Sequence, residues 1–368
     1  MSRNNHDKSV LVAMSGGVDS SVALYLLKEQ GYKVTGATMK LWDFSEVGGA
    51  EHARSSGGCC DLEAINNARN VCQFLGVPHY VLDFSIEFKE IVIDNFVDEY
   101  KHGRTPNPCI LCNTEIKWEM FLKRAREIGC DYMATGHYSR VDYDDEQERY
   151  TIRRGLTNNR DQAYALWGIS QEALARTILP LGELYKSDTR RIAREAGLKT
   201  ADTAESMEIC FVTDDNYERF MREWTGDDIS PGDIVDASGN ILGQHKGIPF
   251  YTIGQRKGLC ITHDHPLYVN RIDVENNRIH VCDGTDVYTK NLIVSNINWV
   301  SIPPQNEPFR GHVQIRYQHV AQLATVYPEE NGKLKIIFDE PQRAITPGQS
   351  AVIFNDDILL AGGFIESR

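Results

Sequence analysis

The first half of the chain alternates short apolar runs with longer stretches of helical spacing, and this alternation restricts the fold more than any other feature. The apolar runs are expected to form buried strands: Val10–Met14, Val34–Met39, Tyr80–Phe84 and Tyr132–Thr135. The helical stretches are expected between and after them: Ser20–Gln30, Asp61–Leu75, Glu87–Tyr100, Glu115–Ile128 and Thr189–Ala196. Glycines follow at helix C-cap positions: Gly31, Gly76, Gly129 and Gly197. The pattern predicts an α/β domain with a doubly wound parallel sheet.

The second part of the chain, from about Asn216, consists of short alternating segments separated by turn sequences. The segments nearest the C-terminus are Gly311–Tyr317, Gln322–Tyr327, Lys333–Phe338, Ala351–Phe354 and Ile358–Phe364. Their number and spacing indicate a small β-barrel. We therefore predict three domains: the α/β domain at 1–212, a small central β-rich domain at 213–287 and a C-terminal β-barrel at 288–368.

The composition indicates a globular protein of the cytoplasm. No apolar run is long enough for a signal peptide or a membrane span, and nine cysteines without a secretory signal favour a reducing compartment. The net charge of −13 speaks against a general nucleic-acid binder but allows a local basic face. Two basic groups are candidates, and the second is explained equally well as a solvated helix face: Arg153, Arg154 and Arg160, then Lys186, Arg190, Arg191 and Arg194.

A glycine-rich loop, Ser15–Ser21 with the sequence SGGVDSS, joins the first predicted strand to the first helix. Backbone N–H groups of such a loop and the dipole of the following helix can hold phosphate. The lysine of a Walker loop and the spacing of a dinucleotide fold are both absent. A simple tight turn is the alternative. The heptapeptide resembles the PP-loop of ATP pyrophosphatases, which implies cleavage of ATP between its α and β phosphates.

Three cysteines are candidates for chemistry. Cys109 and Cys112 form a CxxC pair after two prolines, at the expected start of a helix. A CxxC motif at a helix N-terminus lowers the thiol pKa and suits redox chemistry or metal binding. Cys210 lies at the predicted edge of the α/β domain. Half of a structural zinc site is an alternative for the pair, and a plain buried thiol is the alternative for Cys210.

Longer motifs select one family. These are GRTPNPCILCNTEIKW, ATGHY, NNRDQAY, EICF, YTIGQRKGL and TPGQSAV, which begin at residues 103, 134, 158, 208, 251 and 346. Their order along nearly the whole chain resembles the tRNA-specific 2-thiouridylases. The resemblance implies adenylation of a wobble uridine with ATP and Mg²⁺, then sulfur transfer with release of AMP. It also implies tRNAs for Lys, Glu and Gln as substrates, and a cysteine desulfurase or sulfur-relay protein as the persulfide donor.

The same resemblance assigns roles to individual residues. The residues implied for ATP are Ala13, Met14, Ser15, Gly16, Gly17, Val18, Asp19, Ser20, Met39 and Gly136. Those implied for tRNA and its target base are Asn107, Pro108, Cys109, His137, Arg160, Asp161, Gln162, Arg316, Tyr317 and Gln349. Cys210 is expected to carry the persulfide, and Cys112 is expected to attack it and to form a disulfide with Cys210.

The sequence departs from the family at Cys109, where many members carry a proton-handling aspartate. The extra thiol opens an alternative in which Cys109, Cys112 and Cys210 hold a 4Fe-4S cluster that delivers the sulfur. The adjacent pair Cys59-Cys60 receives no role. Two readings of other classes remain: a PP-loop ligase or amidotransferase acting on a small molecule, and a non-catalytic RNA-binding protein with a degenerate loop.

Overall fold

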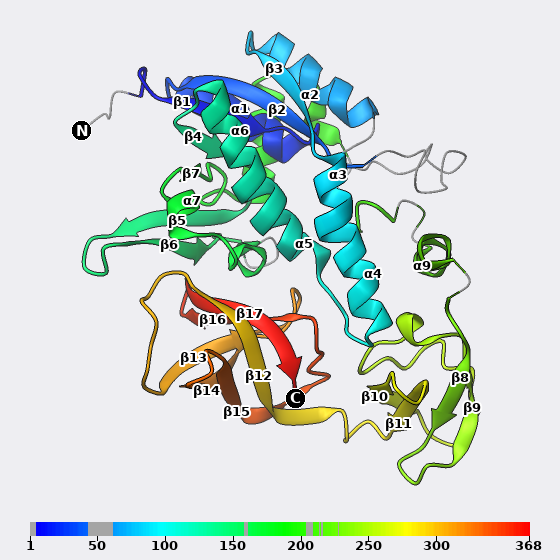
Figure 1. The fold of residues 1–368 in the computed structure, drawn as a ribbon. Helices are drawn as coiled ribbons and strands as arrows, with labels where there is room; N and C mark the ends of the chain where they lie inside the picture. The colour runs from blue at the N-terminus through cyan, green and yellow to red at the C-terminus, as the bar shows by residue number, and fades with distance from the viewer. Residues whose placement is uncertain are drawn as a thin grey trace.

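The computed structural model describes residues 5–42, 62–157, 161–203, 209–212, 214, 216–226 and 228–368. An α/β unit, a small central sheet and a β-barrel follow one another along the chain (Figure 1). Among the helices of these described residues, none has both the length and the apolar character needed to cross a bilayer.

The α/β unit contains a sheet of five parallel strands in the order β3-β2-β1-β4-β7. The strands are β1 (Ser9–Ala13), β2 (Lys33–Lys40), β3 (His79–Asp83), β4 (Tyr132–Ala134) and β7 (Thr177–Ile178). Chain order reverses at β1, because β2 and β4 lie on its two sides. In doubly wound sheets ligands bind at the carboxyl ends of the strands where the order reverses.

The prediction of a fully buried third strand was wrong. β3 lies at one edge of the sheet, and Tyr80 and Val81 are 48% and 43% exposed. Apolar composition alone does not distinguish a central strand from an edge strand, because strand order is a property of the whole sheet.

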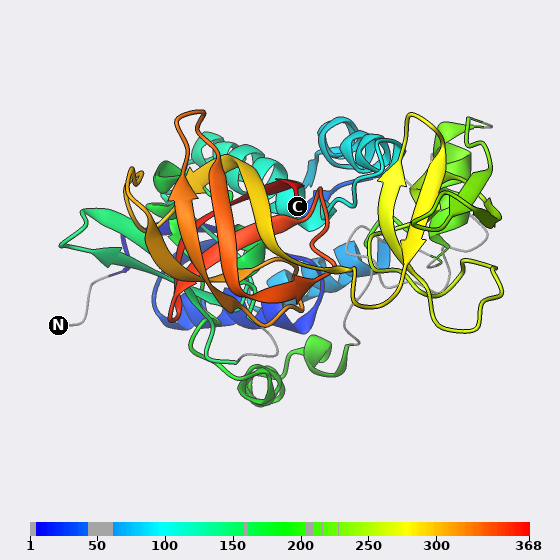
Figure 2. The ribbon, with the colours of Figure 1, turned by 90° about the horizontal axis from the view of Figure 1, so that it is seen from below.

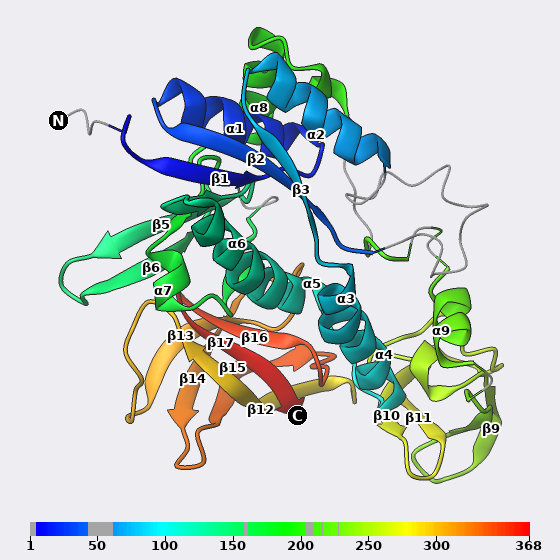
Figure 3. The same cartoon turned by 45° about the horizontal axis from the view of Figure 1, so that its top comes forward.

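Helices pack on this sheet, and several extend beyond it (Figure 3). They are α1 (Val18–Glu29), α2 (Leu62–Phe74), α3 (Ser85–Phe88), α4 (Asp94–Lys101), α5 (Pro108–Leu111), α6 (Phe121–Ile128), α7 (Gln171–Leu174) and α8 (Lys186–Glu195). A π-helical turn, Lys89–Ile93, joins α3 to α4, and another, Cys112–Met120, joins α5 to α6. The predicted C-cap glycines all have positive φ, between 64° and 87°, as a glycine after a helix requires.

The central unit follows α9 (Tyr217–Thr225) and contains a four-stranded sheet with the order β10-β11-β8-β9. Its strands are β8 (Gly232–Val235), β9 (Ile241–His245), β10 (Tyr268–Asp273) and β11 (Arg278–Cys282). A separate apolar cluster that includes Ile234, Val269 and Ile279 forms its core.

Six antiparallel strands form the C-terminal barrel (Figure 2). They are β12 (Tyr288–Trp299), β13 (Phe309–Gln314), β14 (Gln322–Pro328), β15 (Leu334–Arg343), β16 (Ser350–Asn355) and β17 (Ile358–Ser367). Their order is β12-β15-β14-β13-β16-β17, and pairing of β12 with β17 closes the sheet. Closure leaves no free edge among these strands.

A hairpin inserted in the α/β unit joins it to the barrel. This hairpin consists of β5 (Ser139–Asp144) and β6 (Arg149–Arg154), and β6 pairs with β17. The hairpin was not predicted as part of the barrel sheet. The largest apolar core also extends across this junction, from Phe88 and Trp118 to Val352 and Phe354. The two units are therefore held together by backbone pairing and by a shared core.

Candidate functional site

The Ser15–Ser21 loop lies at the carboxyl end of β1, where the order of the sheet reverses. Gly16 has φ of +76°, and a Cβ there would lie 2.3 Å from the Ala64 carbonyl oxygen, so only glycine fits. Gly17 is the N-cap of α1 and provides no side-chain cap. The first N–H groups of α1 thus have no capping side chain, and the dipole of a 12-residue helix points at this position.

Serines brace the loop from within. The Ser21 hydroxyl donates to the Gly17 carbonyl oxygen at 2.8 Å, and the Ser15 amide donates to Ser20 Oγ at 3.2 Å. These bonds fix the path of the backbone around the N-terminus of α1. A prearranged cradle of N–H groups is what phosphate binding requires.

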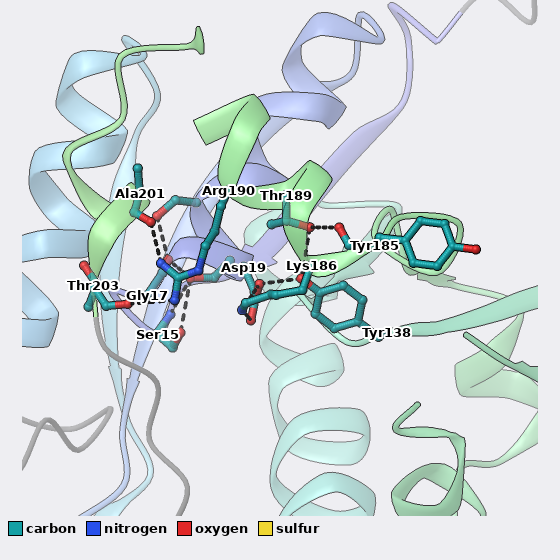
Figure 4. A network of polar contacts seen from close by, with 12 residues as sticks. Ser15, Gly17, Asp19, Tyr138, Tyr185, Lys186, Thr189, Arg190, Ala201 and Thr203 are labelled. Carbon is teal, nitrogen blue, oxygen red and sulfur yellow. Dashed lines mark hydrogen bonds and ion pairs between the residues drawn. The ribbon is translucent and has the colours of Figure 1, made fainter. Parts of the chain in front are cut away.

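Asp19 connects the loop to two other elements. Both of its carboxylate oxygens accept hydrogen bonds from Lys186 Nζ at 2.7 Å, and Oδ1 also accepts from the Tyr138 hydroxyl at 2.7 Å (Figure 4). Tyr138 Oη also lies 2.9 Å from Thr189 Oγ1, one turn after Lys186 in α8. Three elements distant in sequence therefore meet at one carboxylate: α1, the segment after β4, and α8.

The solvated-face interpretation of the second basic group is wrong for Lys186, whose side chain is 14% exposed. Arg190 is also turned inward and donates to the carbonyl oxygens of Ala201 and Thr203. The interpretation does hold for Arg191 and Arg194, which form exposed ion pairs with Glu195 and Asp202.

The remaining residues implied for ATP lie along the same edge of the sheet. Ala13 ends β1, and the Met14 amide donates to the Ala37 carbonyl oxygen of β2. Met39 lies near the end of β2. A Cβ on Gly136 would lie 2.9 Å from the Ser20 amide nitrogen, so glycine permits the close approach of this segment to α1.

The CxxC pair lies in the first turns of the helical run that starts at Pro108. Asn107 caps α5, because its side-chain oxygen accepts a hydrogen bond from the Cys109 amide at 3.2 Å. Cys109 is exposed, whereas Cys112 is buried. Gln349 lies next to the barrel strand β16, and its side-chain amide donates to the carbonyl oxygens of Thr105 and Pro106. The barrel thus positions the loop that carries Asn107, Pro108 and Cys109, the residues implied for the target base.

Cys210 is half-buried and packs against the same apolar core to which Cys112 belongs. The next residue, Phe211, is 1% exposed, and its ring centroid lies 5.2 Å from that of Phe96 and 5.3 Å from that of Phe220. Phe211 therefore anchors the segment.

One cavity of about 1220 Å³ lies between the α/β unit and the barrel and joins the phosphate loop to the CxxC segment; Cys112 and Cys210 are not among its lining residues. Its wall includes Asp19 from the phosphate loop, Asn107 and Cys109 from the CxxC segment, and Tyr317 from the barrel. The predicted residues His137, Asp161 and Gln162 also line it. Asp19 of the phosphate loop, Cys109 of the CxxC segment and Tyr317 of the barrel therefore line one cavity, although they are far apart in the sequence.

Two of the residues implied for tRNA have strong contacts within the protein. The Asp161 side chain is 4% exposed and forms an ion pair with Arg154, and its Oδ1 accepts from the amides of Gly155 and Ala163. Gln162 Oε1 accepts from the Tyr138 amide at 2.9 Å. Arg160, the third member of this segment, lies outside the described residues, as do Cys59 and Cys60.

The other residues implied for tRNA include an exposed tyrosine, and an arginine and a histidine whose pKa values are lowered. Tyr317 is 45% exposed, and the Arg316 guanidinium donates to the Arg343 carbonyl oxygen. Burial and the nearby charge of Arg343 lower the pKa of Arg316. His137 Nδ1 lies 2.7 Å from Thr135 Oγ1, and desolvation together with the Lys117 charge lowers the His137 pKa well below its usual value. His137 is therefore a neutral hydrogen-bonding group at neutral pH.

Several cavity residues were not predicted as site residues. They are Asn113, Lys117, Tyr138, His312, Gln314, Gln318 and His319, whereas Arg154 and Lys186 had been expected only as members of the two basic groups. Lys117 Nζ donates to Asn113 Oδ1 at 2.7 Å, a contact between positions i and i+4 that helical spacing could have suggested. Arg154 donates to Gln314 Oε1 at 2.8 Å and stacks over the Phe354 ring. That contact depends on β6 pairing with the barrel, for which the sequence holds no local signal.

The fold and the loop together define the class. A parallel sheet with a Ser-Gly-Gly phosphate loop at its point of reversal, and without a Walker lysine, is that of a PP-loop nucleotide-binding enzyme. The domain family described as tRNA methyl transferase HUP domain matches residues 8–214. The families described as tRNA methyl transferase PRC-barrel domain and aminomethyltransferase beta-barrel domain match residues 218–283 and 289–365.

Full-length relatives identify the family. The chain is 48% identical over 359 residues to the tRNA-specific 2-thiouridylase MnmA of Acetivibrio thermocellus, covering 98% of this chain and 99% of the relative. It is 48% identical over 360 residues to the protein of the same name from Clostridioides difficile, covering 98% of both chains. The relative from Carboxydothermus hydrogenoformans is 49% identical over 362 residues and 98% of both chains. The chain belongs to the family of tRNA-specific 2-thiouridylases.

Proposed function

We propose that this protein 2-thiolates the wobble uridine of tRNA, using ATP to activate the base before sulfur is added. The observation that carries the proposal is the shared cavity, in which Asp19 of the phosphate loop and Cys109 of the CxxC segment line the same space. A base entering this cavity can meet both an activated phosphate and a thiol. A PP-loop ligase acting on a small molecule has no need for such a wide cavity lined by barrel residues.

The first step is adenylation. The O2 oxygen of the uridine attacks the α-phosphorus of ATP, the bond to the β-phosphate oxygen breaks, and pyrophosphate leaves with its electron pair. N3 of the uridine gives its proton to solvent in this step and takes one back when the thiocarbonyl forms. The N–H groups at the start of α1 and the Ser15–Ser21 loop hold the phosphates. Mg²⁺ would be carried by the phosphate oxygens, with the carboxylate of Asp19 within the same site. Adenylation converts a poor leaving oxygen into AMP.

The second step is sulfur transfer. The terminal sulfur of a Cys210 persulfide attacks C2 of the base, and AMP departs with the C2–O2 electrons. The Cys112 thiolate then attacks Cys210 Sγ, which breaks the S–S bond and leaves the sulfur on the base as a thiocarbonyl. The product is a Cys112–Cys210 disulfide, and a thiol reductant must reduce it before the next cycle. Packing of both cysteines against one apolar core supports this pairing.

A cluster-based route is the alternative for the source of sulfur. Cys109 and Cys112 lie three residues apart in one helical run, and Cys210 packs against the core that contains Cys112, so these three thiols are the candidate ligands of a 4Fe-4S cluster. When bound by these three residues, the cluster would supply an open iron for sulfide. Cys109 has a role in this route and is a neighbour of the base in the persulfide route.

The proposed partners follow from the proposed reaction. The substrates are tRNAs with a wobble uridine, those for Lys, Glu and Gln, and the sulfur donor is a cysteine desulfurase or a sulfur-relay protein. A cytoplasmic location suits the free thiols of Cys72, Cys130, Cys260 and Cys282. We propose that the α/β unit at 1–212 binds ATP, and that the central unit at 213–287 and the barrel at 288–368 bind the RNA.

The experiment is 2-thiouridine formation on unmodified tRNA, run without oxygen in the presence of ATP and a persulfide donor. Metal-stripped protein is compared with protein carrying a reconstituted cluster, each as wild type and as Cys210→Ser and Cys109→Ser. The persulfide route predicts that stripped wild-type and Cys109→Ser proteins both thiolate, and that Cys210→Ser releases pyrophosphate without thiolation. Thiolation only by reconstituted protein, lost in Cys109→Ser, would establish the cluster route. Absence of tRNA-dependent pyrophosphate release in every form would overturn the proposed function.

A further inference from the structure

A cluster of histidine and aspartate side chains lies in the central unit. It is away from the cavity of about 1220 Å³ that Asp19 and Cys109 line, called the thiolation cavity. His263, Asp264 and His265 come from the segment before β10, and their ligand atoms all lie within 4.8 Å of one another. His263 and His265 have ring centroids 4.3 Å apart and planes at 85°. Asp283, directly after β11, contacts the other face of the cluster through His265 Nε2. A cavity of about 380 Å³ adjoins these residues.

A neutral His265 has fewer N–H groups than it has contacts with carboxylate oxygens. Asp264 Oδ1 lies 2.7 Å from Nδ1 of His263 and 2.7 Å from Nδ1 of His265, while Nε2 of His265 faces Asp283 Oδ1. A neutral imidazole has one N–H, so neutral His265 can donate to only one of its two carboxylate partners. The other contact then places a nitrogen lone pair against a carboxylate oxygen. A cation between them removes this repulsion.

We propose that His263, Asp264 and His265 bind one late first-row divalent cation, with Zn²⁺ as the probe, while Asp283 accepts the Nε2–H of His265 and orients its ring. Imidazole nitrogens and carboxylate oxygens are established ligands of Zn²⁺, and two histidines favour it over Mg²⁺ or Ca²⁺. The side chains are 34% to 85% exposed, so the ion exchanges with solvent. The competing explanation is a proton on His265, which would make the cluster an ordinary network of ion pairs.

The position of the cluster indicates what a bound ion would do. Through the contact of His265 with Asp283, it would hold the end of the segment 252–267, which precedes β10, against the end of β11. Thr252 Oγ1 accepts a hydrogen bond from Thr105 Oγ1 at 3.1 Å, and Thr105 precedes the target-base residues Asn107 to Cys109 by two positions. The cation would therefore stiffen a segment that supports the CxxC loop, without entering the thiolation cavity.

The experiment measures Zn²⁺ binding to the tag-free full chain by competition with a chromophoric chelator, at pH 6 and pH 8. All proteins carry Cys109→Ser, Cys112→Ser and Cys210→Ser, so that the site cysteines do not bind the metal. The test variant adds His263→Ala and His265→Ala. The matched control adds His102→Ala and His280→Ala, because these histidines face single aspartates, Asp98 and Asp273, at 3.6 and 3.7 Å. Circular dichroism verifies that every variant folds.

We expect one equivalent of Zn²⁺ to bind to the parent and the control, more tightly at pH 8 than at pH 6, since protons compete for the imidazoles. Binding should weaken at least tenfold in the test variant, and Zn²⁺ should raise the Tm of the parent but not of the test variant. Equal binding by parent and test variant, or no binding at micromolar Zn²⁺, would overturn the proposal. These results do not depend on thiolation activity, so the proposed function can fail while the metal site stands.

Discussion

Lys186 Nζ lies 2.7 Å from both carboxylate oxygens of Asp19, although the two residues are separated by 167 positions in the sequence. The pair joins the N-terminus of α8 to the phosphate loop, and the Tyr138 hydroxyl completes it. Asp19 alone would add negative charge at the loop that we propose holds the ATP phosphates. Lys186 offsets that charge and supplies a cation at the rim of the phosphate cradle.

Replacing Lys186 with Met should slow tRNA-dependent pyrophosphate release by roughly ten- to a hundredfold, because loss of one hydrogen bond to a charged group costs about 1.5–3 kcal/mol. Lys186→Arg should recover part of the rate, since it keeps the charge. The exposed Lys199→Met is the matched control. Wild-type rates in Lys186→Met would show that the pair is only structural.

Replacing Phe211 with Ala should destabilise the protein by about 3–5 kcal/mol, because it empties a site surrounded by Phe88, Phe96 and Phe220. Urea unfolding measures the loss, with the 63% exposed Phe74→Ala as control. We also expect thiolation to fall more than pyrophosphate release, since Phe211 positions Cys210. An equal fall in both activities would contradict a role for Phe211 in placing the thiol.

Replacing Gln349 with Ala should loosen the loop before Asn107, because the Gln349 amide holds the carbonyl oxygens of Thr105 and Pro106. We expect a stability loss of about 1–2 kcal/mol and faster amide hydrogen exchange at residues 105–109. Gln305→Ala, which removes one bond to the Pro303 carbonyl, is the control. Unchanged exchange in this loop would show that the barrel does not position it.

Replacing Arg316 with Ala should weaken tRNA binding and reduce the slope of log K against log salt by about 0.7–0.9, the value for one phosphate contact. Arg310→Ala tests the barrel surface away from the cavity, because Arg310 is engaged by Asp339. Affinities measured between low and moderate salt give the slope. The prediction is wrong if Arg316→Ala lowers affinity with the wild-type slope.

Acid should destabilise the fold below about pH 6.5, the ordinary pKa of histidine. Desolvation lowers the pKa of His79, His137, His245 and His319 in the folded protein, so the unfolded chain binds more protons below that pH. The free energy of unfolding should therefore fall as pH falls. Urea unfolding from pH 7.5 to pH 5 measures it. His137→Gln should flatten the dependence, and a slope equal to that of the wild type would exclude His137 as a contributor.

Local patterns in the sequence were enough to predict the glycine-rich loop after the first strand, the helices that end at Gly31, Gly76, Gly129 and Gly197, and five of the six barrel strands, whereas β12 was not among the predicted segments. These features depend on the conformational needs of a few adjacent residues and on the spacing of apolar side chains. The family resemblance added the grouping of ATP, base and thiol residues.

Only the tertiary structure decided which distant elements meet. It made β3 an edge strand, added the β5–β6 hairpin to the barrel sheet, and turned Lys186 from a supposed surface residue into the partner of Asp19. It also paired Asp161 with Arg154 and placed the Gln349 side-chain amide against the Thr105 carbonyl oxygen. Such contacts depend on strand order and on packing between domains, which are set by the whole chain, so no short stretch of sequence contains them.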